Sequence, residues 1–570
     1  MTIHESPDAR DMTEQEHAVL RQLDVRFGRN GGMLSWQATR VPADPQDGDM
    51  PDVARLPKAV FRGKGKPADR GLASAAEHRG TVLCTHPELM HARPENDHAA
   101  WGPRSYRGVA EFTAQFLKAY YTDADRPRYL EVFNEPFVKA RKMGVTVDAL
   151  SEQHNHVARR VRELCPGVKV GGYSAAYVEL ELDNFRHFNS WQRRFMDIAG
   201  EEMDFFSYHI YDGVNVMGEP RVRTGSNSEA IMDLIDTYSH IKFGVAKPIL
   251  ITEYGGIPKG GMAPMPYDRG RVSDMLYSLV GQLMTFLDHP DRLEKVIPYI
   301  LGRGEWTYGA DGETKPGDAN TFLLWRRDAD GVYVPTDLML FYRFLEGVQG
   351  QWRASRSSDP DVRVQLLADG DRLLALLMNL DSEEKPVAIS GLERVATGAV
   401  RGRFLYTDGD APRFGERQLD EVPTRLTLRP GAAAMLMIQV EEPIDTDATI
   451  REHRVYATEC LQPISSGSPV RFAFKDVPSG EGTAVLRLSA GRPPELAKTP
   501  TRVLINGVRA QVPENWAGGD QSGRKNFFGM IEIPVPFSAE EPVRDVTIIY
   551  PDDGGSVASA VLQVNLTAAR

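Results

Sequence analysis

Three kinds of sequence feature are scarce in this chain, and each scarcity argues against a class of protein. The 570 residues include only three cysteines, far apart and without CxxC or CxxH spacing, which argues against a disulfide-rich scaffold and a structural zinc site. No run of about 18 apolar residues occurs, so no transmembrane helix is predicted. Acidic residues outnumber basic ones, for a formal net charge of −12. Such a charge disfavours nucleic acid and anionic membranes as partners.

Ligand patterns for metals and nucleotides are missing as well. No glycine-rich phosphate loop stands at a predicted strand–helix junction, so no nucleotide is expected. The segment 84–98, "CTHPELMHARPENDH", gathers His86, His91, His98 and Glu88, but their spacing fits no zinc pattern. We therefore predict no metal and no cofactor. We interpret this segment as a loop that lines a site, with His86 and Glu88 nearest its rim.

What the chain does contain, from residue 1 to about 347, is an alternation of short apolar strands with helical patterns. Repeated βα units build parallel sheets, and eight of them, each with a helix or long loop, predict a (β/α)8 barrel. The eight predicted strands are residues 1–6, 23–28, 81–86, 129–134, 168–174, 203–211, 249–254 and 296–301.

Several helices are also predicted from their periodicity. Apolar residues share one face over 109–120 and over 150–164, as an amphipathic helix requires. A helix at 229–243 is expected to begin with a capping box of Ser226 and Glu229 and to end at Gly244. Residues 338–347 would close the barrel.

After residue 350 the helical period disappears and strands alternate with turns. Asp369-Gly370 and Asn506-Gly507 are strong hairpin signals, and two antiparallel β-sandwiches are predicted. The expected boundaries are 1–347 for the barrel, 348–441 for the first sandwich and 442–570 for the second. Trp516 is the one visible aromatic candidate for sugar binding there; alternatively the sandwiches only pack against the barrel.

Two of the barrel strands end in a glutamate. In "YLEVFNEPF" (129–137) Pro136 must stop the strand, which leaves Asn134 and Glu135 at its carboxyl end. In "KPILITEYGG" (247–256) a buried run ends in Glu253 before a Gly-Gly turn. Barrel enzymes keep their chemistry at this end of the strands, and two carboxylates at one rim are what glycoside hydrolysis requires. The alternative is that each is an ordinary glutamate in a helix start or an ion pair.

The two motifs "FNEP" and "TEYGG", at the ends of the fourth and seventh strands, resemble those of clan A glycoside hydrolases, the retaining (β/α)8 enzymes. Within that clan the chain is most similar to family 86, the β-agarases and β-porphyranases. The narrower similarity is carried by "MTIHES" at strand one, "DVRFGRNGG" at strand two, "SYHIYDG" at strand six and the two sandwiches.

This resemblance implies roles for individual residues. Glu135 would be the general acid/base and Glu253 the nucleophile. Asn134 would bind the sugar next to the cleaved bond, and His209 and Tyr211 would orient the nucleophile.

Further positions are implied for substrate contacts. Trp306 would form an aromatic platform under the cleaved sugar, with Tyr254, Trp36 and Trp101 as weaker candidates. Arg26 and Arg29 would contact the nucleophile or the substrate, unless they form a structural ion pair at the rim. Arginines in the long loops 212–228, 255–271 and 302–320 would meet sulfate esters or simply carry solvated charge.

The activity implied is retaining hydrolysis of β-1,4-galactosidic links in a red-algal galactan, agarose or porphyran, by a protein whose partner is this polysaccharide or its oligosaccharides. The alternatives are another clan A β-glycanase and a catalytically inactive carbohydrate-binding barrel. Because a polymer cannot enter the cytoplasm, we expect a secreted, periplasmic or cell-surface protein whose leader lies outside this sequence. If Met1 is the true start, imported oligosaccharides would be the substrate instead.

Overall fold

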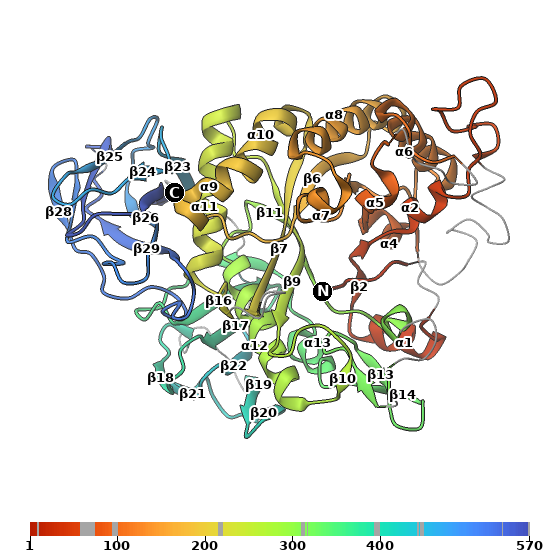
Figure 1. Ribbon diagram of the computed structural model, residues 1–570. Helices are drawn as coiled ribbons and strands as arrows, with labels where there is room; N and C mark the ends of the chain where they lie inside the picture. Colours follow the sequence, from red (N-terminus) through yellow and green to blue (C-terminus); the bar gives the residue numbers. More distant parts are fainter. Residues whose placement is uncertain are drawn as a thin grey trace.

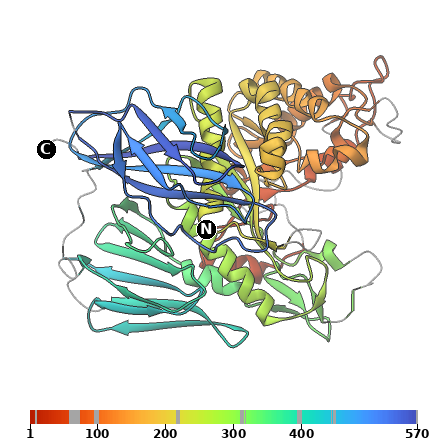
Figure 2. The same ribbon diagram turned by 60° about the vertical axis from the view of Figure 1, so that its left-hand side comes forward.

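The computed structural model describes residues 1–7, 11–56, 74–93, 101–214, 220–308, 314–315, 317–392, 400–441, 444, 450–538 and 540–567. A barrel of parallel strands wrapped by helices occupies the red-to-green part of the chain, and two β-sandwiches in teal and blue lie against one side of it (Figure 1). Turned by 60°, the two sandwiches are stacked one above the other beside the barrel (Figure 2).

The barrel wall consists of parallel neighbours in the order β11-β9-β7-β6-β5-β4-β3, together with the pair β1-β2. Every one of the eight predicted strands is present, and the predicted (β/α)8 fold is confirmed. The strands are β1 (Thr2–Ile3), β2 (Arg26–Phe27), β3 (Arg29–Asn30), β4 (Val82–Cys84), β5 (Tyr129–Glu131), β6 (Lys169–Ala175), β7 (Phe205–Val214), β9 (Ile249–Ile257) and β11 (Leu293–Pro298).

The second predicted strand, 23–28, corresponds to β2, and after Gly28 the chain continues as β3, a strand that was not predicted. β2 pairs with β1, whereas β3 pairs with β4, and this change of partner closes the barrel. A Cβ at Gly28 would lie 2.8 Å from the Ile3 carbonyl oxygen and from Ile297, so only glycine lets the chain cross here. On the other side His4 donates its backbone N–H to the Ile300 carbonyl at 2.9 Å.

The helices surround the wall, and short strands extend the loops. The helices at 109–120 and 150–164 are confirmed as α6 and α8, and that at 338–347 as α13. The helical elements are α1 (Glu14–Gln22), α2 (Met33–Ala38), α4 (Ala75–Gly80), α5 (Pro87–Met90), α6 (Tyr106–Tyr120), α7 (Pro136–Met143), α8 (Val147–Leu164), α9 (Leu182–Phe188), η2 (Asn189–Arg193), α10 (Arg194–Ala199), η3 (Gly200–Glu202), α11 (Ser226–Phe243), α12 (Arg269–Phe286), η4 (Glu305–Tyr308) and α13 (Met339–Leu345), and the short strands are β8 (Pro220–Arg221), β10 (Met265–Pro266), β12 (Asp318–Ala319), β13 (Trp325–Arg327) and β14 (Tyr333–Pro335).

One helix cap was predicted wrongly. Helix α11 ends at Gly244 in the left-handed conformation, as expected, but its N-cap is Gly225 and carries no side-chain cap. Ser226 instead donates its backbone N–H to the Ala517 carbonyl at 2.8 Å, so a loop of the second sandwich caps the helix. Glu229 is fully buried and ion-paired with Arg363 of the first sandwich at 2.6 Å. Tertiary contacts have replaced the local cap.

Both sandwiches and both predicted hairpin turns are present. The first contains a sheet of order β15-β16-β17-β22-β19-β20 and the pair β18-β21; the second contains β23-β31-β26-β29, with β24 on β31, and β25-β30-β27-β28. Their strands are β15 (Gln351–Arg353), β16 (Val362–Asp369), β17 (Arg372–Asn379), β18 (Lys385–Ala388), β19 (Val400–Asp408), β20 (Ala411–Leu419), β21 (Arg425–Leu428), β22 (Ala433–Gln439), β23 (Ile450–Tyr456), β24 (Gln462–Pro463), β25 (Val470–Ala473), β26 (Gly482–Arg492), β27 (Arg502–Ile505), β28 (Val508–Ala510), β29 (Phe527–Val535), β30 (Asp545–Ile549) and β31 (Ser556–Thr567). The exact domain boundaries stay a prediction. Among the described helices, none is long and apolar enough to cross a membrane.

Candidate active site

Glu135 and Glu253 lie at the same end of the barrel and face each other. Glu135 is the N-cap of α7 and has a left-handed backbone, with φ 49° and ψ 48°, a conformation that costs a non-glycine residue about 1–2 kcal/mol. Glu253 lies in β9 directly opposite His209 of β7. One ligating atom from each of these three side chains falls within 4.8 Å of the others. The two carboxyl groups are therefore close enough to act on one bond.

Arg29 is the buried hub that organises this end of the barrel. Its guanidinium is 1% exposed, donates through Nε to Glu131 Oε2 at 2.8 Å, and donates through Nη1 to Glu253 Oε1. Its Nη2 donates to Asn134 Oδ1 and Ser174 Oγ, both at 2.8 Å. Because a guanidinium has only donors, it fixes Oδ1 of Asn134 as the acceptor and turns the Nδ2 amide away from itself.

His209 connects the two glutamates. Its Nδ1 lies 2.7 Å from Glu135 Oε1 and 3.3 Å from Glu253 Oε2. Its Nε2 lies 2.9 Å from Ser174 Oγ, which holds the ring in place from behind. A proton on Nδ1 can therefore be shared between the carboxyl groups, whose relative position is fixed by one buried ring.

The two glutamates differ in their electrostatic surroundings. The Glu253 side chain is 10% exposed and accepts a 2.6 Å hydrogen bond from Tyr211 Oη. Burial opposes its charge, but His209, Arg29 and His4 outweigh burial and hold the pKa of Glu253 well below its usual range. The Glu135 side chain is 26% exposed. One carboxyl is thus held ionised inside the site, and the other reaches solvent.

Six predicted site residues are brought together by these contacts: Glu135, Glu253, Asn134, His209, Tyr211 and Arg29. Two others are not part of the site, and those predictions were wrong. Arg26 lies at the amino end of β2, where it is exposed and pairs with Asp24 at 3.3 Å. Tyr254 is fully buried with its ring against Phe286, because adjacent residues of a strand face opposite sides.

The remaining candidates lie on the rim or in the core. His86 abuts Gly32 at the end of β3, where a Cβ would lie 2.8 Å from its Nε2. Glu88 pairs with Lys139 of α7 at 3.2 Å. Trp306 is 70% exposed in η4, as a platform requires, although no hydrogen bond or ring contact in the described part of the chain joins it to the glutamates. Trp36 is 58% exposed.

Trp101, a weaker candidate for the aromatic platform, is a core residue. It is 1% exposed and packs on Phe112. His91, in the same histidine-rich segment as His86, is buried and bonded to Gln153, and His98 lies outside the described residues.

Four residues of the site were not predicted: His4, Glu131, Ser174 and Tyr299. His4 Nε2 lies 3.4 Å from Glu253 Oε1, and its ring is edge-on to Tyr299, which in turn contacts Tyr211. Glu131 accepts hydrogen bonds from Thr252 Oγ1 at 2.7 Å and from Arg29 Nε at 2.8 Å. The one available signal was an ionisable residue inside an apolar strand, as Glu131 is in "YLEVF".

The cluster of Glu135, His209 and Glu253 also has the composition of a metal site. Its chemistry does not fit a resident cation, because the Arg29 guanidinium already occupies Glu253 Oε1, and a second cation there would meet like charge.

Arginines of the three long loops turn out to be structural. Arg223 is buried and donates to Asn227, Arg269 pairs with Asp337 at 2.8 Å, Arg271 donates to the Gly261 carbonyl at 2.7 Å, and Arg303 pairs with Glu16 at 3.0 Å. Each of these side chains is therefore held by a contact within the fold. The side chain of Arg221 lies outside the described residues.

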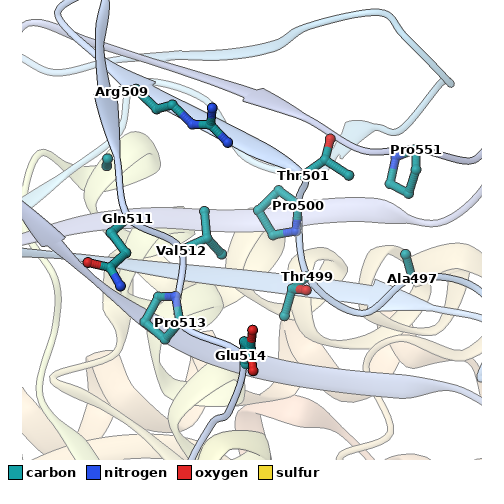
Figure 3. Close-up of a pocket in the computed structure, with 11 residues that line it drawn as sticks. Ala497, Thr499, Pro500, Thr501, Arg509, Gln511, Val512, Pro513, Glu514 and Pro551 are labelled. Atoms are coloured by element: carbon teal, nitrogen blue, oxygen red, sulfur yellow. The ribbon is translucent and has the colours of Figure 1, made fainter.

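The second sandwich has a pocket of its own, of about 650 Å³, between the segments 497–501 and 509–514 (Figure 3). Arg509 and Glu514 give it mixed charge, and no aromatic ring lines it. Trp516 is not among its lining residues; its ring packs edge-on against Phe527. The ring of Trp516 is half-buried, and its role in sugar binding stays a prediction.

Comparisons with known proteins agree on one group of enzymes. The family model "Porphyranase beta-sandwich domain 1" matches residues 361–462, and "beta porphyranase A C-terminal" matches 471–565. Over 469 residues the chain is 34% identical to beta-porphyranase A of Phocaeicola plebeius, covering 78% of this chain and 63% of that protein. It is 28% identical to the funoran endo-beta-hydrolase of Wenyingzhuangia aestuarii, covering 96% of this chain and 76% of that one.

Solved structures give the same result in three dimensions. The complex of BuGH86 with neoagarooctaose superposes with a TM-score of 0.91 at 26% identity, over 100% of this chain and 95% of that one. BpGH86A, a beta-porphyranase of glycoside hydrolase family 86 from Bacteroides plebeius, gives 0.80 at 27%, over 100% and 96%. The comparisons support a porphyranase and agarase family. The chain spans less than two thirds of the porphyranase's length, so the activity of that whole protein is a proposal for this chain.

Proposed function

We propose that this protein is a retaining glycoside hydrolase of family 86 and clan A that cleaves β-1,4-galactosidic links in a red-algal galactan. The observation that carries the proposal is the pairing of Glu135 with Glu253 within 4.8 Å. Retaining enzymes hold their carboxyl groups about 5–5.5 Å apart, whereas inverting enzymes need about 6.5–9.5 Å to admit a water molecule.

The two residues divide the chemistry according to their surroundings. Glu253, held ionised by Arg29, His209 and Tyr211, attacks the anomeric carbon while the bond to the leaving oxygen breaks. Glu135, which is open to solvent, delivers its proton to that oxygen. It then takes a proton from water, which displaces Glu253 and releases the sugar with its original anomeric configuration.

Asn134 and His209 position the reacting groups. The Asn134 amide, oriented by Arg29, donates to the hydroxyl next to the cleaved bond, a contact that strengthens as the ring distorts. His209 bridges both carboxyls and thereby holds their separation while the proton moves. Exposed Trp306 offers an aromatic face to a sugar ring.

The substrate class rests on the relatives. Their names refer to porphyran, funoran and agarose, which are all red-algal galactans. A polymer of this kind is encountered outside the cytoplasm. We therefore propose that the protein is secreted, periplasmic or bound at the cell surface.

The test is product analysis on agarose, porphyran, funoran and a panel of other β-glycans, with Glu135→Gln and Glu253→Gln in parallel. A product ladder from a galactan that both substitutions abolish is the expected result. Turnover that survives both changes would contradict the site. Cleavage of another β-glycan alone would favour a different clan A enzyme, and binding without turnover would favour an inactive carbohydrate-binding barrel.

A further inference from the structure

A second large cavity lies where the barrel and both sandwiches meet. Its volume is about 1280 Å³, above the ~300–1,000 Å³ typical of small-molecule pockets. Its wall comes from the ends of β7 and β9, one face of α12, the first sandwich and the loop 515–522 of the second. It shares no lining residue with the site of Glu135 and Glu253.

This junction cavity is nevertheless close to the catalytic strands. Tyr211 contacts Glu253, while the next residue, Asp212, lines the cavity. Successive residues of a strand face opposite sides, so the β7–β9 layer separates the two spaces.

The cavity wall is preformed by contacts between domains. Asp361 of the first sandwich accepts hydrogen bonds from the Gly518 backbone N–H and from Asn515 Nδ2, both at 2.8 Å. Tyr277 of α12 donates its hydroxyl to the Leu380 carbonyl at 3.1 Å. A Cβ at Gly431 would come within 2.9 Å of the Tyr277 ring, so glycine leaves room for this ring at the wall. A preformed wall reduces the entropy lost when a ligand binds.

The charge of the lining is strongly one-sided. Lys259 is the single cationic residue of the lining, against the aspartates Asp212, Asp274, Asp361, Asp381, Asp410 and Asp520, of which Asp381 is paired with Lys385 at 2.8 Å. Asp274 and Asp410 are exposed, and no salt bridge joins either to a cation within the described ranges. Hydroxyl groups also line the cavity, among them those of Ser273, Ser278, Ser382 and Thr407.

This chemistry selects a ligand rich in hydroxyl groups and free of negative charge. Carboxylates accept hydrogen bonds from sugar hydroxyls, and the serine and threonine hydroxyls both donate and accept. A sulfate ester in the same place would face a surplus of like charge, with Lys259 as the one cation of the lining. A single metal ion does not fit, because the close carboxylate clusters found among the described residues do not include these aspartates.

We propose that the junction cavity is a second carbohydrate site, which takes a short neutral oligosaccharide and excludes sulfated ones. The choice of galactan fragments as its ligands rests on the proposed function. Bound there, a neutral stretch of polymer would be held beside the cleavage site without being cut.

The test is calorimetric titration of the full chain carrying Glu253→Gln, which stops turnover. Neoagarohexaose is expected to give a two-site isotherm, and a sulfated porphyran fragment of equal length a one-site isotherm. Adding Asp274→Lys and Asp410→Lys should weaken the second site at least tenfold and leave the first unchanged. Asp420→Lys, an exposed aspartate remote from the cavity lining, is the matched control, and Asp274→Asn tests charge without reversal.

A one-site isotherm, or no binding, with the neutral fragment would overturn the proposal, as would a second site that survives both lysine substitutions. Second-site binding seen only with a cationic probe such as spermidine would also overturn it. Failure of the proposed function is a separate result: the unsubstituted protein would then hydrolyse no galactan.

Discussion

Two buried networks of charge hold this molecule together, one at the mouth of the barrel and one between the domains. At the mouth, Arg29 is surrounded by Glu131, Glu253 and polar acceptors. Between the domains, Glu229 of α11 pairs with Arg363 of the first sandwich at 2.6 Å and with Arg487 of the second at 3.5 Å. In both networks a buried arginine pairs with a buried acid.

The two networks differ in how their glutamates are paired and how far these side chains are exposed. Glu229 is fully buried and both of its oxygens are paired with arginines, and the acids of this network that reach solvent, such as Glu532, lie at its edge. The network at the mouth ends on Glu135, whose side chain is 26% exposed and whose backbone is left-handed. Buried charge therefore stabilises the fold at the junction and serves chemistry at the mouth, and the strained backbone of Glu135 distinguishes the two.

The largest effect is expected at Glu253. Replacing Glu253 by Gln removes the nucleophile and should lower kcat/KM at least about 10⁴-fold, measured as release of reducing sugar. Glu135→Gln should lower it by about 10²–10⁴-fold. Because only Glu135 protonates the leaving group, a substrate whose leaving group needs no proton should restore the first step in the Glu135 variant alone.

Glu163→Gln is the control, since Glu163 is exposed in α8 and pairs with Arg160 at 2.6 Å. Its kcat/KM should stay within a few-fold of the parent. Restoration of the Glu253 variant by the activated substrate would reverse the assigned roles.

In the junction network the expected effect is on stability rather than on rate. Glu229→Gln leaves Arg363 and Arg487 without their shared buried anion, and should lower the free energy of unfolding by about 3–5 kcal/mol. Glu532→Gln removes a partner of the same Arg487, but one whose side chain is 54% exposed, and should cost under about 1 kcal/mol. Chemical denaturation measures the free energy of unfolding of both variants. Equal losses would show that the buried Glu229 contributes no more than the exposed Glu532.

A third buried group, His154 of α8, belongs to neither network and should make stability depend on pH. Burial lowers its pKa to about 4, whereas the unfolded chain has about 6.5. Between about pH 4 and 6.5 only the unfolded state binds the proton. The free energy of unfolding is therefore highest above about pH 6.5 and is lower by about 2 kcal/mol at pH 5. His154→Gln should remove most of this loss in denaturation curves at pH 7 and 5. An unchanged loss would assign it to another group.

The smallest loss of activity is expected at Tyr211. Tyr211→Phe keeps the ring and removes the 2.6 Å hydrogen bond to Glu253, a bond to a charged group worth about 1.5–3 kcal/mol. We expect kcat/KM to fall about 10–100-fold. The pKa of Glu253 should rise, which moves the acidic limb of the pH–rate profile to higher pH. Tyr254→Phe, which alters a buried hydroxyl on the other face of the strand, should leave both unchanged.

The sequence was sufficient for features that depend on neighbouring residues. The helix start at Pro136 and the turns at Gly370 and Gly507 follow from local backbone preferences, and all eight barrel strands were located from their apolar runs. The turn predicted at the Gly-Gly pair after Glu253 was wrong, because β9 continues through it to Ile257. Long-range contacts could not be predicted in the same manner. The cap of α11 comes from Ala517, and His4 and Ser174 enter the site only because the barrel closes around Arg29.

Arg26 and Arg29 show the limit most clearly. They are three residues apart in one motif, and no local signal separates them. The break at Gly28 leaves one in a solvent-exposed pair with Asp24 and the other in the centre of the barrel. Only the closed barrel distinguishes them.

The anomeric configuration of the first-formed product tests the central claim most directly. ¹H NMR during the first minutes of hydrolysis of a neutral agarose oligosaccharide distinguishes the two anomers before they interconvert. Two carboxyls this close predict the β anomer first, as a covalent intermediate on Glu253 requires. Initial release of the α anomer would contradict the roles given to Glu135 and Glu253.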